Sequence, residues 1–156
     1  MTLRELRKNK GITQQQAADF VGMPLRTYSN YENDSKKQNS IKYKYIIEKL
    51  YTYGYIDEDT GVLTLDEIKR GCTSVLSKYS VEYCYLFGSY AKGKALPSSD
   101  VDLLVCTSVS GLKFYGLVEE LREQLKKRVD VLDQKQIMDN FELTNEILKD
   151  GIKIYG

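Results

Sequence analysis

Three short segments of the chain carry residue types that could handle phosphate groups and a cation. The first is Gly88-Ser89, which follows an apolar run with the character of a strand and opens a turn into a helix. The first backbone N–H groups of such a helix have no intrahelical partner, so they can bind an anion. Together with the Ser89 hydroxyl and the positive charge of Lys92, they predict a cradle for phosphate oxygens.

The second and third segments supply carboxylates. Asp100 and Asp102 open a predicted strand, and residues two apart on a strand point to the same face, so their side chains project together. Two acids in a site that also holds phosphates repel one another unless a cation neutralises them. Mg²⁺ is the expected cation, because it binds one or two carboxylates and completes its octahedron with water and phosphate oxygens. Asp130, a single acid in an otherwise apolar strand, could join them from a neighbouring strand.

A purely structural interpretation of these acids is also open. In that interpretation Asp100 caps a turn, Asp102 is a surface acid, and Asp130 pairs with Arg128 or a lysine. The site interpretation is favoured because three independent features occur in the right order on suitable elements.

Composition limits the classes of protein that the chain could represent. Hydrophobic residues make up 42% and charged residues 29%, a balance typical of folded globular proteins. No apolar run approaches the about 20 residues that cross a bilayer, and the amino terminus lacks the apolar core of a signal peptide, so we expect a cytoplasmic protein with no membrane association. The chain has no histidine, which excludes histidine acid–base catalysis and argues against a zinc site. Three widely spaced cysteines in apolar surroundings predict buried thiols rather than disulfides: Cys72, Cys84 and Cys106.

The order of predicted elements indicates an α+β protein of two modules. The amino-terminal module, residues 1–37, reads as three short helices with a Gly-containing turn, the outline of a helix-turn-helix. Residues 38–63 are expected to hold a connecting amphipathic helix and a small hairpin. The carboxyl-terminal module, residues 64–156, is predicted to form a mixed sheet with flanking helices. Its expected strands are 81–87, 101–106, 129–132 and 152–155.

The motifs in the carboxyl-terminal module resemble those of a known family. Gly-Ser-x-Ala-Lys-Gly, then Ser-Asp-x-Asp-Leu-Leu-Val and a later Val-Asp-Val, are similar to the minimal nucleotidyltransferases (MNT) of the DNA polymerase beta-like superfamily over about residues 64–156. The resemblance implies that Asp100 and Asp102 bind Mg²⁺ and that Asp130 completes the metal site and helps to activate the attacking hydroxyl. It also implies that Gly88 and Ser89 bind the nucleoside triphosphate, which is ATP in the leading hypothesis.

One position departs from the family pattern. Lys92 stands where the family more commonly has arginine, so the positive charge is kept but the bidentate fork is lost.

The three acids are suited to an in-line displacement at the α-phosphorus of the nucleotide, because two cations about 3.5–4 Å apart can stabilise both the attacking oxygen and the leaving pyrophosphate. No covalent enzyme intermediate is needed.

The amino-terminal module resembles the helix-turn-helix of the phage-repressor (XRE) family. Residues 1–50 carry 10 Lys/Arg against 5 Asp/Glu, a balance suited to the phosphates of DNA. The resemblance places the third helix in the major groove. There we expect base contacts from Arg26, Thr27 and Asn30, and phosphate contacts from Gln15 and from Lys36 or Lys37. Arg7 and Glu32 match a pair of residues that is structural in the family, so we do not expect them to contact DNA. The alternative to DNA binding is that this module is a helical bundle that binds protein.

The resemblances lead to one main hypothesis and two alternatives. In the main hypothesis, the chain transfers AMP to a hydroxyl of a HEPN-type ribonuclease toxin, acts as its antitoxin, and represses its own genes by binding operator DNA. A second hypothesis is a repressor whose transferase fold only binds; a third is a small-molecule (antibiotic) nucleotidyltransferase. A single helix-turn-helix reads DNA weakly, since specific sites usually need two half-sites about 34 Å apart, so a homo-oligomer or another partner is implied.

Overall fold

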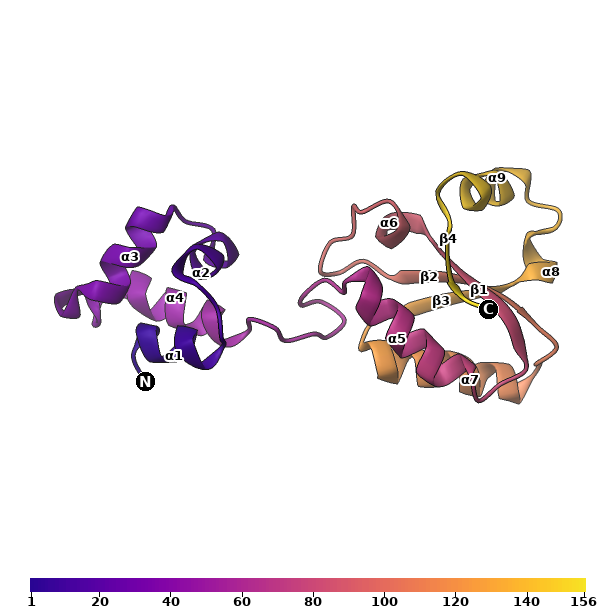
Figure 1. Ribbon diagram of the computed structural model, residues 1–156, viewed down its shortest axis with the longest axis horizontal. Helices are drawn as coiled ribbons and strands as arrows, with labels where there is room; N and C mark the ends of the chain where they lie inside the picture. The colour runs from indigo at the N-terminus through magenta and orange to yellow at the C-terminus, as the bar shows by residue number, and fades with distance from the viewer. The chain divides into compact units, whose positions relative to one another are not determined.

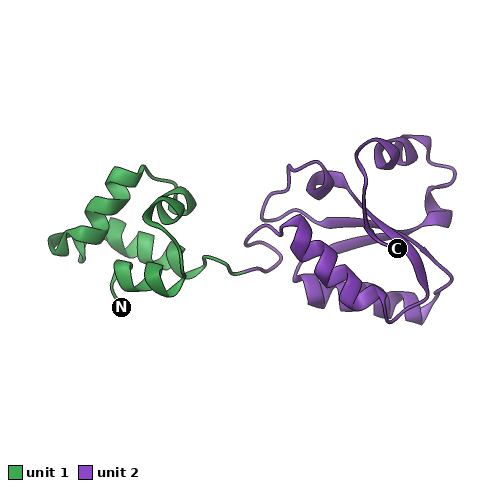
Figure 2. Ribbon diagram, viewed as in Figure 1, with its two compact units in different colours: residues 1–55 green, residues 56–156 purple.

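All 156 residues are described in the computed structural model, and they divide into two compact units. The first unit is Met1–Tyr55 and the second is Ile56–Gly156 (Figure 2). The first is entirely helical, whereas the second combines helices with one mixed sheet. The predicted fold class, α+β with a helix-turn-helix module and a mixed-sheet module, is therefore confirmed.

The first unit contains α1 (Leu3–Asn9), α2 (Gln14–Val21), α3 (Leu25–Asn33), a short 3-10 turn η1 (Ser35–Lys37) and α4 (Ile41–Tyr51) (Figure 1). Capping boxes close the amino ends of α1 and α2, where Thr2 pairs with Glu5 and Thr13 with Gln16. Gly22 follows α2 with φ of +76°, a left-handed conformation that costs glycine little, and the chain turns there into α3.

The helix expected as a connector between modules is instead part of the first unit. The phenol oxygen of Tyr43 on α4 accepts a hydrogen bond from the backbone N–H of Leu3 at 2.9 Å, which joins α4 to α1. Tyr28 is fully buried, and Tyr31 packs half-buried against the same core. The buried side chains of this core come from all four helices and the loop between α1 and α2: Leu3, Leu6, Ile12, Ala17, Ala18, Val21, Tyr28, Tyr43, Ile46 and Leu50.

The second unit alternates helices with strands. Its elements are α5 (Leu65–Leu76), β1 (Val81–Phe87), α6 (Gly88–Ala91), β2 (Val101–Thr107), α7 (Leu112–Leu125), β3 (Val129–Asp133), α8 (Gln134–Ile137), α9 (Phe141–Asp150) and β4 (Ile152–Tyr155). The four strands lie in the order β3-β2-β1-β4. β1 is antiparallel to both β2 and β4, and β2 is parallel to β3. All four predicted strands form, and the short helix α8 is the element that the sequence did not predict.

The two faces of the sheet are covered differently. One face is packed by α5 and α7, and side chains such as Leu86, Leu103 and Val129 fill the main core between them. On the other face lie α8 and α9 (Figure 1), where Leu104 and Ile147 belong to a smaller apolar cluster, whereas Tyr90 of α6 is buried in the main core. Because side chains alternate along a strand, Asp102 next to Leu103 and Asp130 next to Val129 point to this second face. That face also carries the acids of β2 and β3.

The hairpin expected near residues 53–64 does not form. No residue of this segment is in a strand, and Asp57 and Thr60 instead close a tight turn through two backbone hydrogen bonds of 3.1 and 3.4 Å. The physical reason is that the carbonyl groups of Thr60 and Gly61 accept hydrogen bonds from the ammonium group of Lys127 at 3.1 and 2.6 Å, so they have a partner other than an opposing strand. This turn belongs to the second unit.

The cysteines are all free thiols, as predicted, but only two of them are buried. Burial raises the pKa of Cys72 to about 12 and the pKa of Cys84 well above its usual value. Cys106 is partly exposed because its side chain points to the second face of the sheet, where its sulfur lies 3.0 Å from the side-chain oxygen of Gln134. No helix is long and apolar enough to cross a membrane.

Candidate active site

The sheet brings two of the predicted acids side by side. Asp102 is the second residue of β2, and its parallel partner across the ladder is Asp130 of β3. On the other side of β2, its antiparallel partner is Phe87, the last residue of β1. Asp102 therefore lies between the strand that carries the third acid and the strand that leads directly into Gly88-Ser89. Both halves of the predicted site meet at this one residue.

Gly88 is required at its position by both space and conformation. Its φ of +70° lies in the left-handed region, which L side chains rarely adopt. A Cβ atom on Gly88 would also collide with the carboxylate of Asp102. The glycine thus lets the backbone of the turn lie against the carboxylate. No side chain caps the amino end of the four-residue helix α6 that starts here, and Ser89 is its second residue.

Asp102 is in an unfavourable electrostatic environment. Its pKa is raised to about 6, first by burial and then by the negative charges of Asp130, Asp100 and Glu146. No cationic side chain is hydrogen-bonded to it. A half-buried carboxylate surrounded by other carboxylates is the arrangement that a bound cation relieves, and oxygen donors of this kind suit a hard cation such as Mg²⁺.

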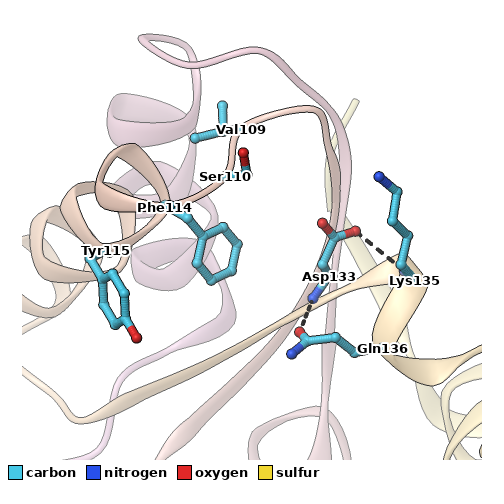
Figure 3. Close-up of a pocket in the computed structure, with 8 residues that line it drawn as sticks. Val109, Ser110, Phe114, Tyr115, Asp133, Lys135 and Gln136 are labelled. Atoms are coloured by element: carbon cyan, nitrogen blue, oxygen red, sulfur yellow. Dashed lines mark hydrogen bonds between the residues drawn. The ribbon is translucent and has the colours of Figure 1, made fainter.

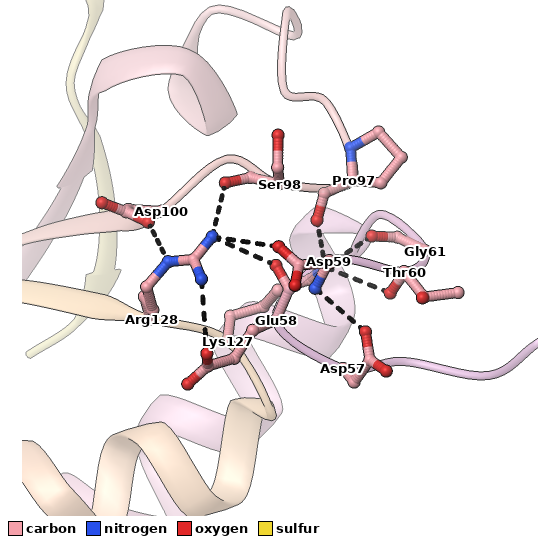
Figure 4. A network of polar contacts seen from close by, with 10 residues as sticks. All are labelled: Asp57, Glu58, Asp59, Thr60, Gly61, Pro97, Ser98, Asp100, Lys127 and Arg128. Carbon is pink, nitrogen blue, oxygen red and sulfur yellow. Dashed lines mark hydrogen bonds and ion pairs between the residues drawn. The ribbon is translucent and has the colours of Figure 1, made fainter.

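Asp100 lies just before β2 and has a cationic neighbour. The Nε atom of Arg128 donates to its Oδ1 atom at 3.0 Å (Figure 4), and both side chains are 41% exposed. One carboxylate oxygen is therefore bound by the guanidinium group. The structural interpretation in which Arg128 pairs with Asp130 is not observed, because the arginine pairs with Asp100 instead.

The carboxylates are near each other but do not form a closed ligand set. No group of three or more His, Cys, Asp or Glu side chains lies close enough to hold a metal ion in the observed rotamers. Like charges repel, and Arg128 draws Asp100 to its own side. The residues nevertheless fit Mg²⁺, because the donors are all carboxylate oxygens and the glycine at Gly88 lets the backbone of the predicted phosphate-binding turn lie directly against one of them.

Lys92 follows α6 and forms an ion pair that the sequence did not predict. Its ammonium group lies 2.8 Å from a carboxylate oxygen of Glu146 on α9. This hydrogen bond raises the pKa of Lys92. Glu146 also acts on Asp102 through its charge, so it is a fourth acid of the site. The ion pair spans 54 residues of sequence, and no local pattern distinguishes Glu146 from the other polar residues of its amphipathic helix.

Comparisons with known proteins agree with this geometry. Residues 71–156 match the family described as polymerase beta, nucleotidyltransferase. The chain belongs to the polymerase beta nucleotidyltransferase family. A helix-turn-helix family matches residues 3–43. The predicted resemblances, and the expectation that the chain is a nucleotidyltransferase enzyme, are therefore confirmed.

Two relatives of this nucleotidyltransferase carry the name of a protein adenylyltransferase, and a chain of one solved complex aligns with it in structure. A Methanocaldococcus jannaschii protein, provisionally named a protein adenylyltransferase, is 37% identical over 92 residues, which are 58% of this chain and 91% of the relative. The protein adenylyltransferase MntA of Thermococcus cleftensis is 38% identical over 78 residues, covering 46% of this chain and 79% of the relative. A chain of the solved complex between tri-AMPylated Shewanella oneidensis HEPN toxin and MNT antitoxin aligns at 20% identity and a TM-score of 0.46, over 60% of this chain and 73% of that one.

The residues predicted to contact DNA lie around α2, α3 and η1 of the nucleotidyltransferase's first unit. Arg26 and Asn30 are exposed on α3, whereas Thr27 between them is half-buried. Gln15 is exposed on α2, and its amide donates to Asp19 at 2.8 Å. Lys36 is exposed at η1. Lys37 is half-buried, and its ammonium group lies 5.0 Å from the ring centroid of Tyr31.

A separate hollow of about 460 Å³ lies near the opposite end of β3 from Asp130. Figure 3 shows it between the start of α7 and the start of α8. None of the predicted site residues lines it; the lining residues are Val109, Ser110, Gly111, Phe114, Tyr115, Asp133, Lys135 and Gln136. The chemistry predicted from the sequence is therefore confined to the Asp102 end of the sheet.

Proposed function

We propose that this nucleotidyltransferase moves AMP from ATP onto a hydroxyl of a partner protein, with Mg²⁺ as cofactor. The observation that carries the proposal is the meeting of Gly88 with Asp102, and of Asp102 with Asp130 across the ladder. This arrangement places the backbone of the predicted phosphate-binding turn directly against one of a pair of carboxylates. The two relatives named as protein adenylyltransferases support AMP as the transferred group and a protein as the acceptor.

Each residue of the site has a distinct role in the proposed reaction. Asp100, Asp102 and Asp130 would hold Mg²⁺, which supplies charge neutralisation at the phosphates when it is bound. The backbone of Gly88 and Ser89 binds phosphate oxygens, and Lys92 adds positive charge beside them. Lys92 is engaged by Glu146 at 2.8 Å, so nucleotide phosphates compete with this carboxylate for the ammonium group.

Asp130 has the further role of orienting the acceptor hydroxyl. It is the most exposed of the three acids, whereas Asp100 and Asp102 are half-buried, so an incoming protein surface can reach it. A carboxylate within hydrogen-bond distance of the hydroxyl can accept its proton as the oxygen attacks the α-phosphorus. The pyrophosphate leaves in line on the opposite side, and no covalent enzyme intermediate forms.

The acceptor in this proposal is a HEPN-type ribonuclease toxin, for which the chain is the antitoxin. The family resemblance of the catalytic unit is the source of this part of the proposal. The first unit adds operator binding, so that the protein represses the gene pair that encodes it. Exposure of Arg26 and Asn30 on α3 of a helix-turn-helix supports this role, because arginine and asparagine are suited to guanine and adenine edges.

The transferase part is tested by incubating the purified chain with ATP labelled at the α-phosphate, with and without Mg²⁺ and the HEPN protein encoded beside it. We expect label on the HEPN protein only when both the chain and Mg²⁺ are present. Absence of both label transfer and ATP binding would refute the proposed activity. Transfer to an antibiotic but not to any protein would move the proposal to a small-molecule acceptor.

The DNA-binding part is tested separately by mobility shift on the chain's own promoter. We expect a double variant, Arg26→Ala with Asn30→Ala, to lose about 1–3 kcal/mol of specific binding per base contact removed. Lys8→Ala on α1 is the matched control, because it removes an exposed positive charge away from α3. Equal losses in the two variants would indicate a non-specific charge effect and contradict base recognition.

A further inference from the structure

Two consecutive cationic residues, Lys127 and Arg128, lie between α7 and β3 and point to different environments. Lys127 is 1% exposed, whereas Arg128 is partly exposed. The residue before them, Lys126, is the one non-glycine residue of the chain with positive φ, at 57°. This left-handed residue ends α7 and turns the chain sharply. The turn directs the Lys127 side chain inward, and Arg128 follows beside the active-site acids.

Lys127 joins two loops to the sheet without using a carboxylate. Its ammonium group donates three hydrogen bonds, to the carbonyl oxygens of Thr60 at 3.1 Å, Gly61 at 2.6 Å and Pro97 at 2.7 Å (Figure 4). An ammonium group has three protons, so its donor capacity is filled. The segment 57–61 and the loop before Asp100 are therefore held to the same residue, just before β3.

Arg128 connects the same two loops to a metal-site acid. Besides Asp100, its guanidinium group contacts the carbonyl oxygen of Ser98 at 3.1 Å, a carboxylate oxygen of Glu58 at 3.3 Å and one of Asp59 at 3.4 Å. Its own backbone carbonyl accepts from the N–H of Val101 at 2.9 Å. Both the side chain and the backbone of Arg128 thus bind the segment that presents Asp100.

From these contacts we infer that Arg128 is a positioning residue for Asp100. It binds Oδ1 and leaves Oδ2 to a divalent cation, and the acidic residues Glu58 and Asp59 hold the guanidinium group in that place. A carboxylate that binds a metal with one oxygen is commonly oriented by a hydrogen bond at the other, and losing such a partner costs metal affinity. This inference rests on the proposed function, because it concerns the proposed metal site.

The two acidic residues Glu58 and Asp59 also have a defined role in this arrangement. A guanidinium group next to a metal site repels the cation, and the two carboxylates of Glu58 and Asp59 offset that charge on the side away from Asp100. The turn 57–61, which replaces the expected hairpin, is therefore part of the support of the active site rather than a simple connector. The turn begins two residues after Tyr55, where the first unit ends.

The test is direct binding of Mn²⁺ to the 156-residue chain without nucleotide, measured by electron paramagnetic resonance. We expect Arg128→Gln to weaken Mn²⁺ binding about ten- to hundred-fold. Arg128→Lys keeps the charge but lacks the fork that spans Asp100 and Ser98, so it should restore little of the affinity. A double variant, Glu58→Gln with Asp59→Asn, leaves the Arg128–Asp100 bond in place and should lose less affinity than Arg128→Gln.

The control is Arg122→Gln, which removes an arginine that pairs with Glu119 at 2.9 Å on the surface of α7. It should bind Mn²⁺ as the wild type does. Unchanged or tighter binding by Arg128→Gln would overturn the inference, because it would mean that Arg128 only stabilises the fold or competes with the cation. Full rescue by Arg128→Lys would also overturn it. Failure of the wild type to bind Mn²⁺ would instead contradict the proposed function, so the two failures are distinguishable.

Discussion

Each unit of this protein buries part of a carboxylate among other charged groups, but only the first unit neutralises it. Glu32 of α3 has a fully buried side chain, and both of its oxygens are bound by the guanidinium group of Arg7 at 2.9 Å. Asp102 of β2 is half-buried next to Asp130 and has no cationic partner. The two acids are of similar chemistry and differ in what surrounds them.

The pKa values show the consequence of that difference. Burial alone would raise the pKa of Glu32, but hydrogen bonds from Arg7 and Gln14 outweigh it, so the pKa is lowered. Burial also raises the pKa of Asp102, and the neighbouring acids add to the rise instead of opposing it. The charge of Glu32 is neutralised within the fold, whereas Asp102 is an unpaired carboxylate among like charges, and a bound cation would relieve that cost.

The largest expected effect is the loss of transfer when an acid of the second unit is removed. Asp130→Asn keeps the size of the side chain but removes the charge that completes the proposed metal site. Because Asp130 is exposed, the fold should tolerate the change. We expect AMP transfer to fall by about three orders of magnitude, or about 4 kcal/mol of transition-state stabilisation. Asp139→Asn, an equally exposed acid between α8 and α9, is the control and should keep full activity.

Features that depend on residues close in the sequence could be predicted, whereas features that depend on contacts between distant segments could not. The sequence predicted Asp100, Asp102 and the turn at Gly88 as parts of one candidate site because their spacing along a strand and into a helix is local, and the structure places Gly88 against Asp102. The Arg7–Glu32 pair was expected from family resemblance and is present. Glu146 and the turn at residues 57–61 were missed, because they reach the site only when α9 and β3 pack against distant segments.

The next effect concerns the first unit, where breaking the buried ion pair should destabilise the fold. Glu32→Ala leaves the Arg7 guanidinium, whose side chain is only 14% exposed, without its counter-charge. We expect the free energy of unfolding of the first unit to fall by about 3 kcal/mol. Hydrogen exchange of the α1 and α3 amides measures this loss locally.

AMP transfer by the same variant should change little, because no residue of the catalytic unit is altered. The control is Glu48→Ala on α4, an exposed acid for which no ion pair is seen. If Glu32→Ala and Glu48→Ala destabilised the first unit equally, the ion pair would not be the source of its stability, and the contrast between the two units would be lost.

A smaller effect should follow from adding a side chain at Gly88, where the Asp102 carboxylate lies against the backbone. Gly88→Ala combines a strained left-handed backbone with a collision against that carboxylate. Gly93→Ala is a close control, because Gly93 also has φ of +70° but nothing lies within 4 Å of its added Cβ atom. Both variants should lose about 1 kcal/mol of stability from backbone strain. We expect only Gly88→Ala to lose transfer activity, by about a hundred-fold; equal activity of the two variants would argue that the turn does not need to approach Asp102.

The smallest expected effect is a pH dependence that has opposite signs in the two units. In the unfolded chain Asp102 takes up its proton near its ordinary value of about 3.9, whereas in the folded protein its pKa is about 6. Between these values the folded state binds more protons than the unfolded state. The contribution of Asp102 to the free energy of unfolding therefore falls as pH rises from about 4 to about 6. For Glu32, whose pKa is lowered, the stabilisation is present above its ordinary pKa and is lost as pH falls below it.

Asp102→Asn isolates the contribution of Asp102 from the other titrating groups. In buffer with a chelator, urea unfolding of wild type and variant should give nearly equal stabilities of the second unit at pH 4. At pH 7 the variant should be more stable by about 1 kcal/mol, a value reduced from the full pKa shift because the carboxylate is only half-buried. A variant that is less stable than the wild type at pH 7 would mean that Asp102 is held by favourable contacts, and the proposed distinction between a structural acid and a cation-binding acid would fail.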